Sequence, residues 1–284
     1  MTDLLITSPA NPRLKALVAL RRRRVREETG TTLVEGLEEL TLALEAGVSP
    51  RSLFYCPELM PQAGALDALL GHPRMQAVEL VRLGRPAFEK VAYREGPDGV
   101  LAVVDSVVRA CAELEVRAAP LVLVCEAVEK PGNLGAMLRT ADAAGAAAVV
   151  AADPVTDWGN PNLVRASKGT VFSVPVASDS TATALAWLHD QGIALVASTP
   201  DGDVDYAELD YTGPVAVAVG AEKLGLTRAV LDEAAYHARI PMVGRANSLN
   251  VATSAAIIVY EAVRQRRHRQ RGPGGGLGDA GRAV

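Results

Sequence analysis

Cysteine and histidine, on which disulfide-rich and zinc-binding proteins depend, are scarce in this sequence. Its three cysteines, Cys56, Cys111 and Cys125, are odd in number, lie far apart in the 284 residues and form no CxxC pair. The four histidines show no spacing typical of metal ligands. These absences argue against a disulfide framework and against a zinc site, so we expect no bound metal.

Long apolar runs and a targeting signal are missing as well. The first ten residues, MTDLLITSPA, contain no basic region followed by a long apolar stretch, which argues against a signal peptide. The longest apolar stretches, such as AAGAAAVVAA at 143–152, are too short to cross a bilayer. We therefore expect a soluble, cytoplasmic protein that does not enter a membrane.

Aromatic residues make up only 4% of the chain, and Ala, Val and Leu supply most of the 49% that is hydrophobic. Such small and aliphatic side chains suit tightly packed layers of helix and sheet. The length exceeds that of one average domain, so one large or two modest domains are expected. The net charge of −4 excludes a uniformly basic binder of polyanions, although arginines crowd at two places.

Apolar periodicity divides the chain into two alternating α/β units. The first has predicted helices at 11–28 and 35–45 and predicted strands at 52–56, 75–80 and 100–104. The second has predicted strands at 121–127, 146–152, 171–176, 193–198 and 215–220, and helices at 133–145 and from Val251 to about Arg267. The strand at 121–127, LVLVCEA, is continuously apolar, as strands of parallel sheets tend to be. We expect domains at 1–105 and 120–268, a linker at 106–119 and a Gly-rich, disordered tail at 269–284.

The first strand of the second unit is followed by the stretch EKPGNLGAMLRTADAAG. Neither the GxGxxG fingerprint nor the GxxxxGK[ST] phosphate loop occurs at a strand-to-helix junction, which disfavours a dinucleotide-dependent enzyme. Pro131 and Gly132 predict a turn, and Asn133 can cap the helix that follows. Arg139 either pairs with Asp142 on the helix surface or faces a phosphate or reacting oxygen.

Two later segments also place polar residues after strands. In VAVAVGAEKLGLT (215–227), Gly220 ends a strand and Glu222 follows it, in the kind of loop where parallel sheets form ligand crevices. Glu222 can equally be a solvated surface residue. After ARIPM (238–242), the stretch GRANSLNV (244–251) places Ser248 and Asn250 before the last helix, although one capping side chain would suffice.

In this order, the stretches PGNLGAMLRTADAAG, GAEKLGL and IPM…SLNVATSAAIIVYEAVRQR closely resemble the three motifs of the SpoU/TrmH family, the RNA 2′-O-ribose methyltransferases of the SPOUT class. The resemblance covers about residues 120–268, and Ala221 and Lys130 depart from the family's commonest pattern. The stretch NPRLKALVALRRRRVREETGTTLVEGLEEL resembles the family's small substrate-binding domain, of the ribosomal-protein L30e type. The layout is similar to ribosomal-RNA methyltransferases, including those that confer resistance to thiopeptide antibiotics.

The resemblance implies an α/β fold, with a trefoil-knotted methyltransferase domain preceded by a small L30e-like α/β domain. It also implies a homodimer that completes each active site across its interface. The implied cofactor is S-adenosylmethionine, and the implied cofactor contacts are Gly220, Ile240, Met242 and Leu249, with Thr199 as a further candidate. The implied catalytic residues are Asn133, Arg139, Glu222, Ser248 and Asn250.

The resemblance also suggests a role for each catalytic residue. The motif-one arginine, Arg139 of the partner subunit, can act as a base or as an electrostatic stabiliser. Because a guanidinium is almost never deprotonated, holding a phosphate and stabilising negative charge on the 2′ oxygen is physically easier for it. Asn133 and Asn250 are expected to orient the ribose and Arg139. Ser248 would bond near the reacting hydroxyl, and Glu222 would shape the cofactor loop and hold Arg or Asn side chains.

The basic residues fit an RNA partner. A strip able to bind phosphates without sequence preference is predicted at Arg13, Lys15, Arg21, Arg22, Arg23 and Arg24, with Arg165 as a further contact. The alternative is a solvated helix end, and the arginines at 264–271 can serve RNA or only solubilise the tail. The predicted activity is S-adenosylmethionine-dependent 2′-O-methylation of a ribose in 23S ribosomal RNA, with antibiotic resistance as one role. The alternatives are a tRNA 2′-O-methyltransferase and a non-catalytic RNA-binding protein with a degenerate knot.

Overall fold

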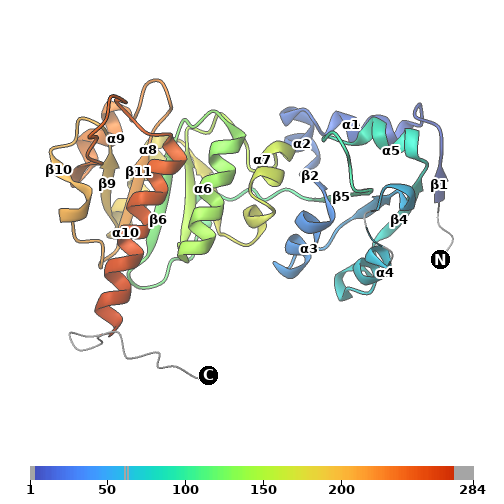
Figure 1. Ribbon diagram of the computed structural model, residues 1–284, viewed down its shortest axis with the longest axis horizontal. Coiled ribbons are helices and arrows are strands. Elements are labelled where there is room, and N and C mark those ends of the chain that lie inside the picture. The colour runs from blue at the N-terminus through green and yellow to red at the C-terminus, as the bar shows by residue number, and fades with distance from the viewer. Residues whose placement is uncertain (1–3, 61, 63, 272–284) are drawn as a thin grey trace.

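The computed structural model describes residues 4–60, 62 and 64–271, which form two lobes (Figure 1). The small lobe comprises residues 4–105 and the large lobe residues 121–271. Helix α7 (Pro161–Ala166) of the large lobe lies between them. Every helix in these described ranges is too short or too polar to cross a membrane.

The small lobe is a mixed five-stranded sheet with helices on both faces. Its strand order is β1-β4-β3-β5-β2, with β1 (Leu4–Ile6), β2 (Thr31–Glu35), β3 (Ser52–Tyr55), β4 (Glu79–Leu83) and β5 (Val100–Asp105). The helices are α1 (Pro12–Ala19), α2 (Arg23–Thr29), α3 (Leu37–Glu45), α4 (Ala65–Leu70) and α5 (Arg85–Val91). Leu14 of α1 and Phe88 of α5 pack with Phe54 of β3 on one face, whereas Leu40 of α3 packs with Leu53 on the other.

The large lobe is a seven-stranded sheet in which every strand pair is parallel. Its order is β10-β12-β9-β11-β6-β7-β8, with β6 (Leu121–Glu126), β7 (Ala148–Ala152), β8 (Val176–Asp179), β9 (Ala194–Ser198), β10 (Val204–Asp205), β11 (Val215–Val219) and β12 (Tyr236–Arg239). The predicted parallel α/β architecture of this unit is therefore present. Strands β6 and β11 lie side by side at the centre, and the winding direction of the chain reverses between them, which makes a topological switch point.

Both faces of this sheet are covered by helices, which explains the continuously apolar strands. Leu123 and Cys125 face α6 (Pro131–Ala144) and α10 (Val251–Arg271), while Val122 and Val124 face α8 (Thr181–Asp190) and α9 (Arg228–Glu233). The last helix buries Ala255, Ile258 and Ala262, which lie along one side of it. In Figure 1, α6 and α10 cross the same face of the sheet.

The helix predicted at 11–28 is wrong, because the chain breaks it into α1 and α2. Arg22 is extended between them, and the guanidinium of Arg26 donates to the carbonyls of Leu20 at 2.8 Å and Arg21 at 3.0 Å. Arg26 is only 3% exposed and also pairs with Asp157 of the large lobe, at 3.0 Å from Nε to Oδ1. A contact with a distant residue therefore ends a helix that the local pattern would continue.

Other predicted boundaries also differ. The strand predicted at 171–176 is wrong: Thr170–Phe172 form a 3-10 turn, and β8 begins only at Val176, after Pro175, which has no N–H to donate. The strand predicted at 75–80 lies at 79–83, and β1, β2, β10 and β12 were not predicted. Helix α10 continues to Arg271, past the predicted end at Arg267. Of the tail predicted to be disordered, 272–284 lies outside the described residues.

The two lobes pack through a shared hydrophobic cluster and specific polar contacts. Buried residues of α3 and β3 belong to the same core cluster as Leu134 of α6 and Val164 of α7. Thr32 of β2 donates a hydrogen bond to the carbonyl of Gly159, and Lys168 pairs with Glu38 at 2.7 Å. The small lobe is thus held against the large lobe along α7.

Candidate active site

Polar side chains from three separate loops meet at the carboxyl edge of the large sheet. Asn133 lies near the start of α6, Glu222 follows β11, and Asn250 precedes α10. The Nδ2 of Asn133 donates to Oε1 of Glu222, and the Nδ2 of Asn250 donates to Oδ1 of Asn133 at 3.2 Å. The three residues, called here the amide–carboxylate chain, join the three motif segments at the switch point between β6 and β11.

Helix α10 sets the direction of these hydrogen bonds. The Oδ1 of Asn250 accepts from the backbone N–H groups of Ala252, at 2.9 Å, and Thr253, at 3.3 Å, as a helix cap. Its Nδ2 must therefore point away from the helix, towards the oxygen of Asn133. The nitrogen of Asn133 then faces the carboxylate of Glu222. The second oxygen of Glu222 has no hydrogen-bond partner among the described residues, so it can accept a hydrogen bond from a ligand.

The residues predicted to contact a cofactor follow three neighbouring parallel strands. Thr199 follows β9, Gly220 follows β11, and Ile240 follows β12. Because carboxyl ends of parallel strands meet at one edge, all three lie on the edge that carries the amide–carboxylate chain. Thr199 and Ile240 are half-buried, and Gly220 is buried. Met242 and Leu249, in the loop before α10, are exposed.

Gly220 is a place where the chain folds tightly back on itself. A Cβ at Gly220 would lie 2.2 Å from the carbonyl carbon of Gly225, so no other residue fits without moving the loop. The N–H of Gly225 donates to the carbonyl of Ala221 at 2.9 Å, and Gly225 has φ +67°, the left-handed region that glycine favours. The loop of residues 220–227 is thus a compact turn that presents Glu222 on its outer side.

The loop before α10 leaves its backbone groups open. Residues 241–250 are all exposed, and the backbone groups of 242–249 form no hydrogen bond with any described residue. Val243 is 100% exposed, and Leu224 of the neighbouring loop is 90% exposed. Free backbone donors and acceptors beside apolar side chains are suited to a ligand with both polar edges and apolar parts.

Two of the predicted catalytic residues form no hydrogen bond with the amide–carboxylate chain. Ser248 is exposed and makes no side-chain hydrogen bond within the described ranges. Arg139 is exposed and likewise has no partner among the described residues. Asp142, the surface partner considered for it, accepts from Ser173 at 3.0 Å. Six residues separate Arg139 from Asn133 on α6, which places the side chains about 120° apart around the axis and about 9 Å apart along it.

Gly135, one turn before Arg139 on α6, allows close packing between helices. A Cβ at Gly135 would lie 2.5 Å from the Cβ of Ala166, so α6 and α7 approach each other closely there. Arg165, on α7, is exposed and lies 3.5 Å from the amide oxygen of Asn162, at the outer limit of a hydrogen bond. Its guanidinium remains available on the surface between the lobes.

Contacts within the protein already engage most residues of the predicted basic strip. Arg21 donates to the carbonyl of Ala92 at 2.7 Å, and Arg23 reaches the carbonyls of Pro154 and Val155. Ion pairs join Arg13 to Glu79, Arg23 to Glu27 and Arg24 to Glu28. Lys15 and Arg22 have no such partner in the described part of the chain, so they are the residues of the strip most available to a polyanion.

The arginines at the end of α10 are also largely engaged. Arg266 donates to the carbonyls of Tyr211 at 2.9 Å, Ala119 at 2.8 Å and Gly213 at 2.6 Å, and so fastens the helix to the linker and a loop. Arg264 pairs with Glu261 at 2.7 Å. Arg266 therefore stabilises the fold, a role that neither of the two sequence-based interpretations anticipated.

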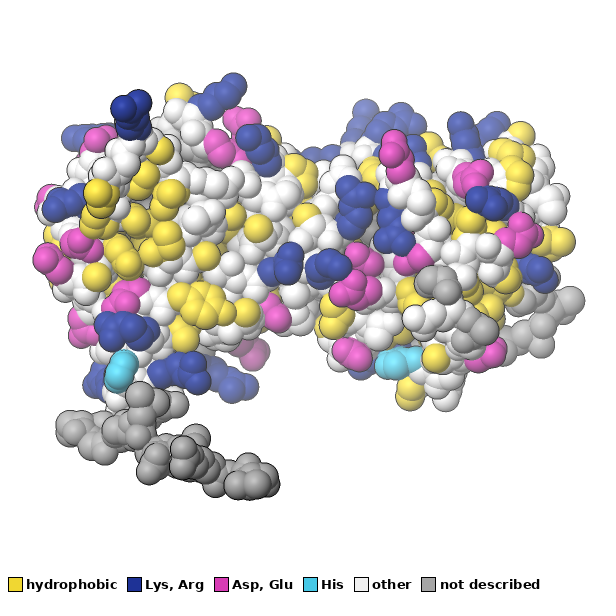
Figure 2. All heavy atoms as spheres, in the orientation of Figure 1, with side chains coloured by type: hydrophobic (Ala, Val, Ile, Leu, Met, Phe, Trp, Pro, Cys, Tyr) yellow, Lys and Arg dark blue, Asp and Glu magenta, His cyan; other side chains and the backbone are white. Residues whose placement is uncertain are grey.

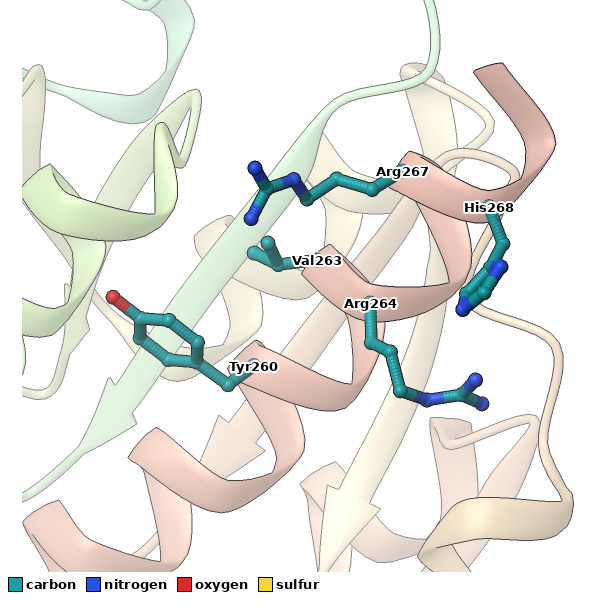
Figure 3. A pocket seen from close by; sticks show the side chains of 5 residues that line it. All are labelled: Tyr260, Val263, Arg264, Arg267 and His268. Carbon is teal, nitrogen blue, oxygen red and sulfur yellow. The ribbon is translucent and has the colours of Figure 1, made fainter. Parts of the chain in front are cut away.

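A hollow of about 280 Å³ lies along α10 and is lined by Tyr260, Val263, Arg264, Arg267 and His268 (Figure 3). Figure 3 shows Tyr260, Val263 and Arg267 projecting from the same side of the helix. Tyr260 follows Asn250 by ten residues, about 15 Å along the helix. This hollow is therefore separate from the amide–carboxylate chain.

The cysteines offer no alternative chemistry. Burial raises the pKa of Cys111 and of Cys125 to about 12, so both stay protonated at neutral pH and are poor nucleophiles. No group of three or more His, Cys, Asp or Glu residues with a metal-binding arrangement exists among the described residues. The polar chemistry at the sheet edge therefore rests on amide, carboxylate, hydroxyl and guanidinium groups.

One buried residue near the site was not predicted. Glu126, at the end of β6, is 1% exposed and accepts hydrogen bonds from Thr227, in the loop after β11, and Thr181. The sequence signal was available, since Glu126 is the single charged residue of the otherwise apolar stretch LVLVCEA. A charge at the end of a buried strand indicates a specific partner.

These features define a doubly wound α/β domain with a polar site at the switch point of its sheet, preceded by a smaller α/β lobe. The model of the SpoU rRNA Methylase family matches residues 120–260, and that of the MRM3-like substrate binding domain matches residues 11–102. The first match covers most of the large lobe, and the second covers most of the small lobe.

Similar proteins span nearly the whole chain. The 23S rRNA (uridine(2479)-2′-O)-methyltransferase of Streptomyces viridochromogenes is 33% identical over 89% of this chain and 88% of its own length. The 23S rRNA (guanosine(2553)-2′-O)-methyltransferase RlmP of Bacillus subtilis is 31% identical over 90% and 97%. The crystal structure of the SpoU methyltransferase AviRb from Streptomyces viridochromogenes in complex with AdoMet superposes with a TM-score of 0.83, at 31% identity over 90% and 98%. The chain belongs to the SpoU methylase family.

Proposed function

We propose that this protein transfers a methyl group from S-adenosylmethionine to the 2′-hydroxyl of a ribose in 23S ribosomal RNA. The amide–carboxylate chain of Asn250, Asn133 and Glu222 carries this proposal, because it gathers one polar residue from each family motif at the sheet edge. Relatives similar over about nine-tenths of the chain are named as 23S rRNA 2′-O-methyltransferases, which supports ribosomal RNA as the substrate.

The loops at this edge fit S-adenosylmethionine. An adenosine edge and a methionyl end need hydrogen-bonding groups, and the open backbone of 242–249 offers them. The thioether and adenine need apolar surface, which Ile240, Met242 and Leu249 provide. Gly220 allows the loop to turn tightly beside the cofactor, and Thr199 borders the same edge. The bound cofactor supplies an electrophilic methyl group on its sulfonium.

Replacing Gly220 with Ala is expected to weaken the binding of S-adenosylhomocysteine at least about tenfold, equivalent to 1.4 kcal/mol. The added Cβ would lie 2.2 Å from Gly225, so the 220–227 loop must move. Gly213→Ala is the control, because nothing lies within 4 Å of a Cβ there. Calorimetry measures both affinities, and equal binding by Gly220→Ala and wild type would exclude Gly220 from the cofactor site.

The chain's own residues prepare the ribose for in-line attack. Asn133 donates one side-chain N–H to Glu222 and Asn250 donates one to Asn133, so each keeps a second N–H that can hold a ribose oxygen. The free oxygen of Glu222 can accept a hydrogen bond from a ribose hydroxyl. Ser248, exposed beside Asn250, can bond the reacting hydroxyl. Holding the ribose 2′ oxygen in contact with the methyl carbon, in line with the bond that breaks, accounts for much of the expected rate enhancement.

Arg139 is proposed to act from the partner subunit of a homodimer. Within one chain it lies on a different side of α6 from Asn133, and no described residue neutralises it. A guanidinium from a second copy can hold the adjacent phosphate in bidentate fashion and stabilise charge on the 2′ oxygen. The side of α10 that presents Tyr260, 48% exposed, and Val263 offers apolar surface for such a dimer. Sedimentation that shows an active monomer would overturn this arrangement.

The RNA is proposed to lie across both lobes. Figure 2 shows Lys and Arg side chains along the upper edge of the molecule, over the loops that follow the large sheet and over the part of the small lobe that holds α2. On the small lobe, Lys15 and Arg22 are the uncommitted members of the basic strip. Arg165 lies between the lobes, where it can contact the same strand. Contacts of this kind bind RNA by backbone and shape.

A Lys15→Gln, Arg22→Gln double variant tests this surface. Each lost phosphate contact should lower the slope of log affinity against log salt by about 0.7–0.9, so the pair should lower it by about 1.4–1.8. Filter binding of a 23S rRNA fragment at several salt concentrations measures the slope. Arg51→Gln is the control, since Arg51 already pairs with Asp105 at 2.6 Å. A slope equal to that of wild type would remove the small lobe's basic strip from the RNA interface.

Finer features of the architecture are part of the same proposal. We assign residues 1–105 to an L30e-like RNA-binding domain, 106–119 to a linker and 120–271, to the end of α10, to a trefoil-knotted methyltransferase domain. The end of β5 at Asp105, the start of β6 at Leu121 and the two family-model matches support these boundaries. A protein that methylates ribosomal RNA is expected in the cytoplasm.

Mapping ribose methylation tests the activity directly. Ribosomal and transfer RNA from a host that expresses the protein would be compared with RNA from a host that expresses Arg139→Ala. A new 2′-O-methyl group in 23S rRNA is expected with the wild type only. Methylation confined to tRNA would establish the alternative substrate, and no methylation would favour a non-catalytic RNA-binding protein. Growth of the same strains on ribosome-targeting antibiotics decides whether the modification confers resistance.

A further inference from the structure

A buried carboxylate lies directly beneath the 220–227 loop. Glu126 ends β6, the strand next to β11, and its side chain is almost completely shielded from water. Its Oε2 accepts from the backbone N–H of Thr227 at 2.7 Å, and its Oε1 accepts from the hydroxyl of Thr227 at 2.6 Å. The hydroxyl of Thr181, at the start of α8, lies 3.1 Å from Oε1 and also donates to Asp153 at 2.7 Å.

These hydrogen bonds restrain the far end of the loop. Its near end is continuous with β11 at Gly220, and Gly225 folds against Gly220. Between these points, Glu222 and Leu224 project into solvent. The loop enters α9 at Thr227. Both hydrogen bonds from Thr227 to Glu126 link the loop to the end of the neighbouring strand, β6. Glu126 therefore sets the distance between the end of β6 and the end of the loop.

A buried carboxylate is energetically unfavourable at the end of β6 unless it has specific partners. Burying a charged group is unfavourable unless hydrogen bonds compensate for the lost water, and an apolar residue would continue the pattern of β6. The compensation at Glu126 comes from two bonds to one loop residue, and bonds to a charged acceptor are stronger than neutral ones. The arrangement fixes one loop geometry and is more specific than apolar packing would be.

We propose that Glu126 is a positioning residue, which holds the 220–227 loop in the conformation that binds S-adenosylmethionine. It acts through Thr227 and does not touch cofactor or ribose. Through the loop it also places Glu222, and hence the amide nitrogen of Asn133, at the switch point. This inference rests on the proposed methyltransferase function for the identity of the ligand.

The experiment compares two threonines that share the same carboxylate. Thr227→Val removes the hydroxyl bond on the loop side, and Thr181→Val removes the bond on the α8 side. We expect Thr227→Val to weaken S-adenosylhomocysteine binding about tenfold, the effect of one lost bond to a charged group. Thr181→Val should change it less than about twofold, and Thr227→Ser, which keeps both bonds, should restore it. Calorimetry measures the affinities, and urea unfolding measures the stability of each variant.

Variants of Glu126 give a second test. Glu126→Gln can keep its oxygen on the Thr227 N–H while the two hydroxyls reverse to accept from its amide, so binding should be retained. Glu126→Leu removes every bond and should raise KM for S-adenosylmethionine with a smaller change in kcat. Equal losses of affinity in Thr227→Val and Thr181→Val, in step with their stability, would overturn the positioning role, as would wild-type binding by Thr227→Val. Failure of the wild type to bind S-adenosylhomocysteine would instead refute the proposed function.

Discussion

Arg139→Ala is expected to slow methyl transfer about 10²- to 10³-fold, the effect of removing one preorganised donor to developing negative charge. The reason is the isolation of this guanidinium, since Arg139 is exposed on α6 without a partner among the described residues. It stabilises no helix cap or buried pair, so its loss should leave the fold and the affinity for S-adenosylhomocysteine unchanged. Single-turnover methylation of a 23S rRNA fragment measures the rate.

Two further variants test whether the effect of Arg139→Ala comes from the loss of this particular guanidinium or only from the loss of one positive charge. Arg117→Ala removes another exposed arginine, in the linker, that also has no partner within the described ranges, and it should methylate at the wild-type rate. Arg139→Lys keeps the charge but not the planar fork, so it should recover only part of the lost rate. Full activity of Arg139→Ala would contradict the assignment of this residue.

Mixing variants tests the shared site. Arg139→Ala and Asn250→Ala subunits are each expected to be inactive alone. If Arg139 acts on the partner's ribose, half of randomly mixed dimers contain one intact site, and activity should return to about a quarter of that of the wild type. Absence of recovery, with mixed dimers demonstrated by mass spectrometry, would place Arg139 and Asn250 in the same subunit's site.

Asp157→Ala is expected to reduce the free energy of unfolding by about 3 kcal/mol, the lower end of the range for breaking a buried ion pair. The low end applies because the Asp157 side chain is 20% exposed, whereas that of Arg26 is 3% exposed and would keep an uncompensated charge. Urea denaturation followed by circular dichroism measures the change. The rate of RNA methylation should also fall, because the small lobe would lose one of its fixed contacts with the large lobe.

A surface ion pair provides the control for this change. Asp105 pairs with Arg51 at 2.6 Å, but both side chains are more than half exposed, so Asp105→Ala should reduce stability by less than about 1 kcal/mol. Equal effects of the two substitutions would show that the Arg26–Asp157 contact is no stronger than an exposed pair. The lobes would then be held mainly by the hydrophobic cluster around α7.

Side-chain contacts between distant residues explain where the sequence-based predictions failed. The helix at 11–28 has no local reason to stop, and it is Arg26, drawn to Asp157, that binds the carbonyls ending α1. The basic strip looked uniform, but Arg21 and Arg23 are used by carbonyls of other segments. None of these partners lies within a local window of sequence.

By itself, the sequence determined the elements whose signals are local. Continuously apolar strands predicted a parallel sheet, and three motifs in a fixed order indicated the family and the candidate site residues. Only the tertiary structure joined Asn250 to Asn133 and Glu222, placed Glu126 under the loop of Thr227 and separated Arg139 from that group within one chain. The physical reason is that hydrophobic periodicity is repeated along many neighbouring residues. A hydrogen bond between two side chains 89 or 117 residues apart depends on the position of every strand between them.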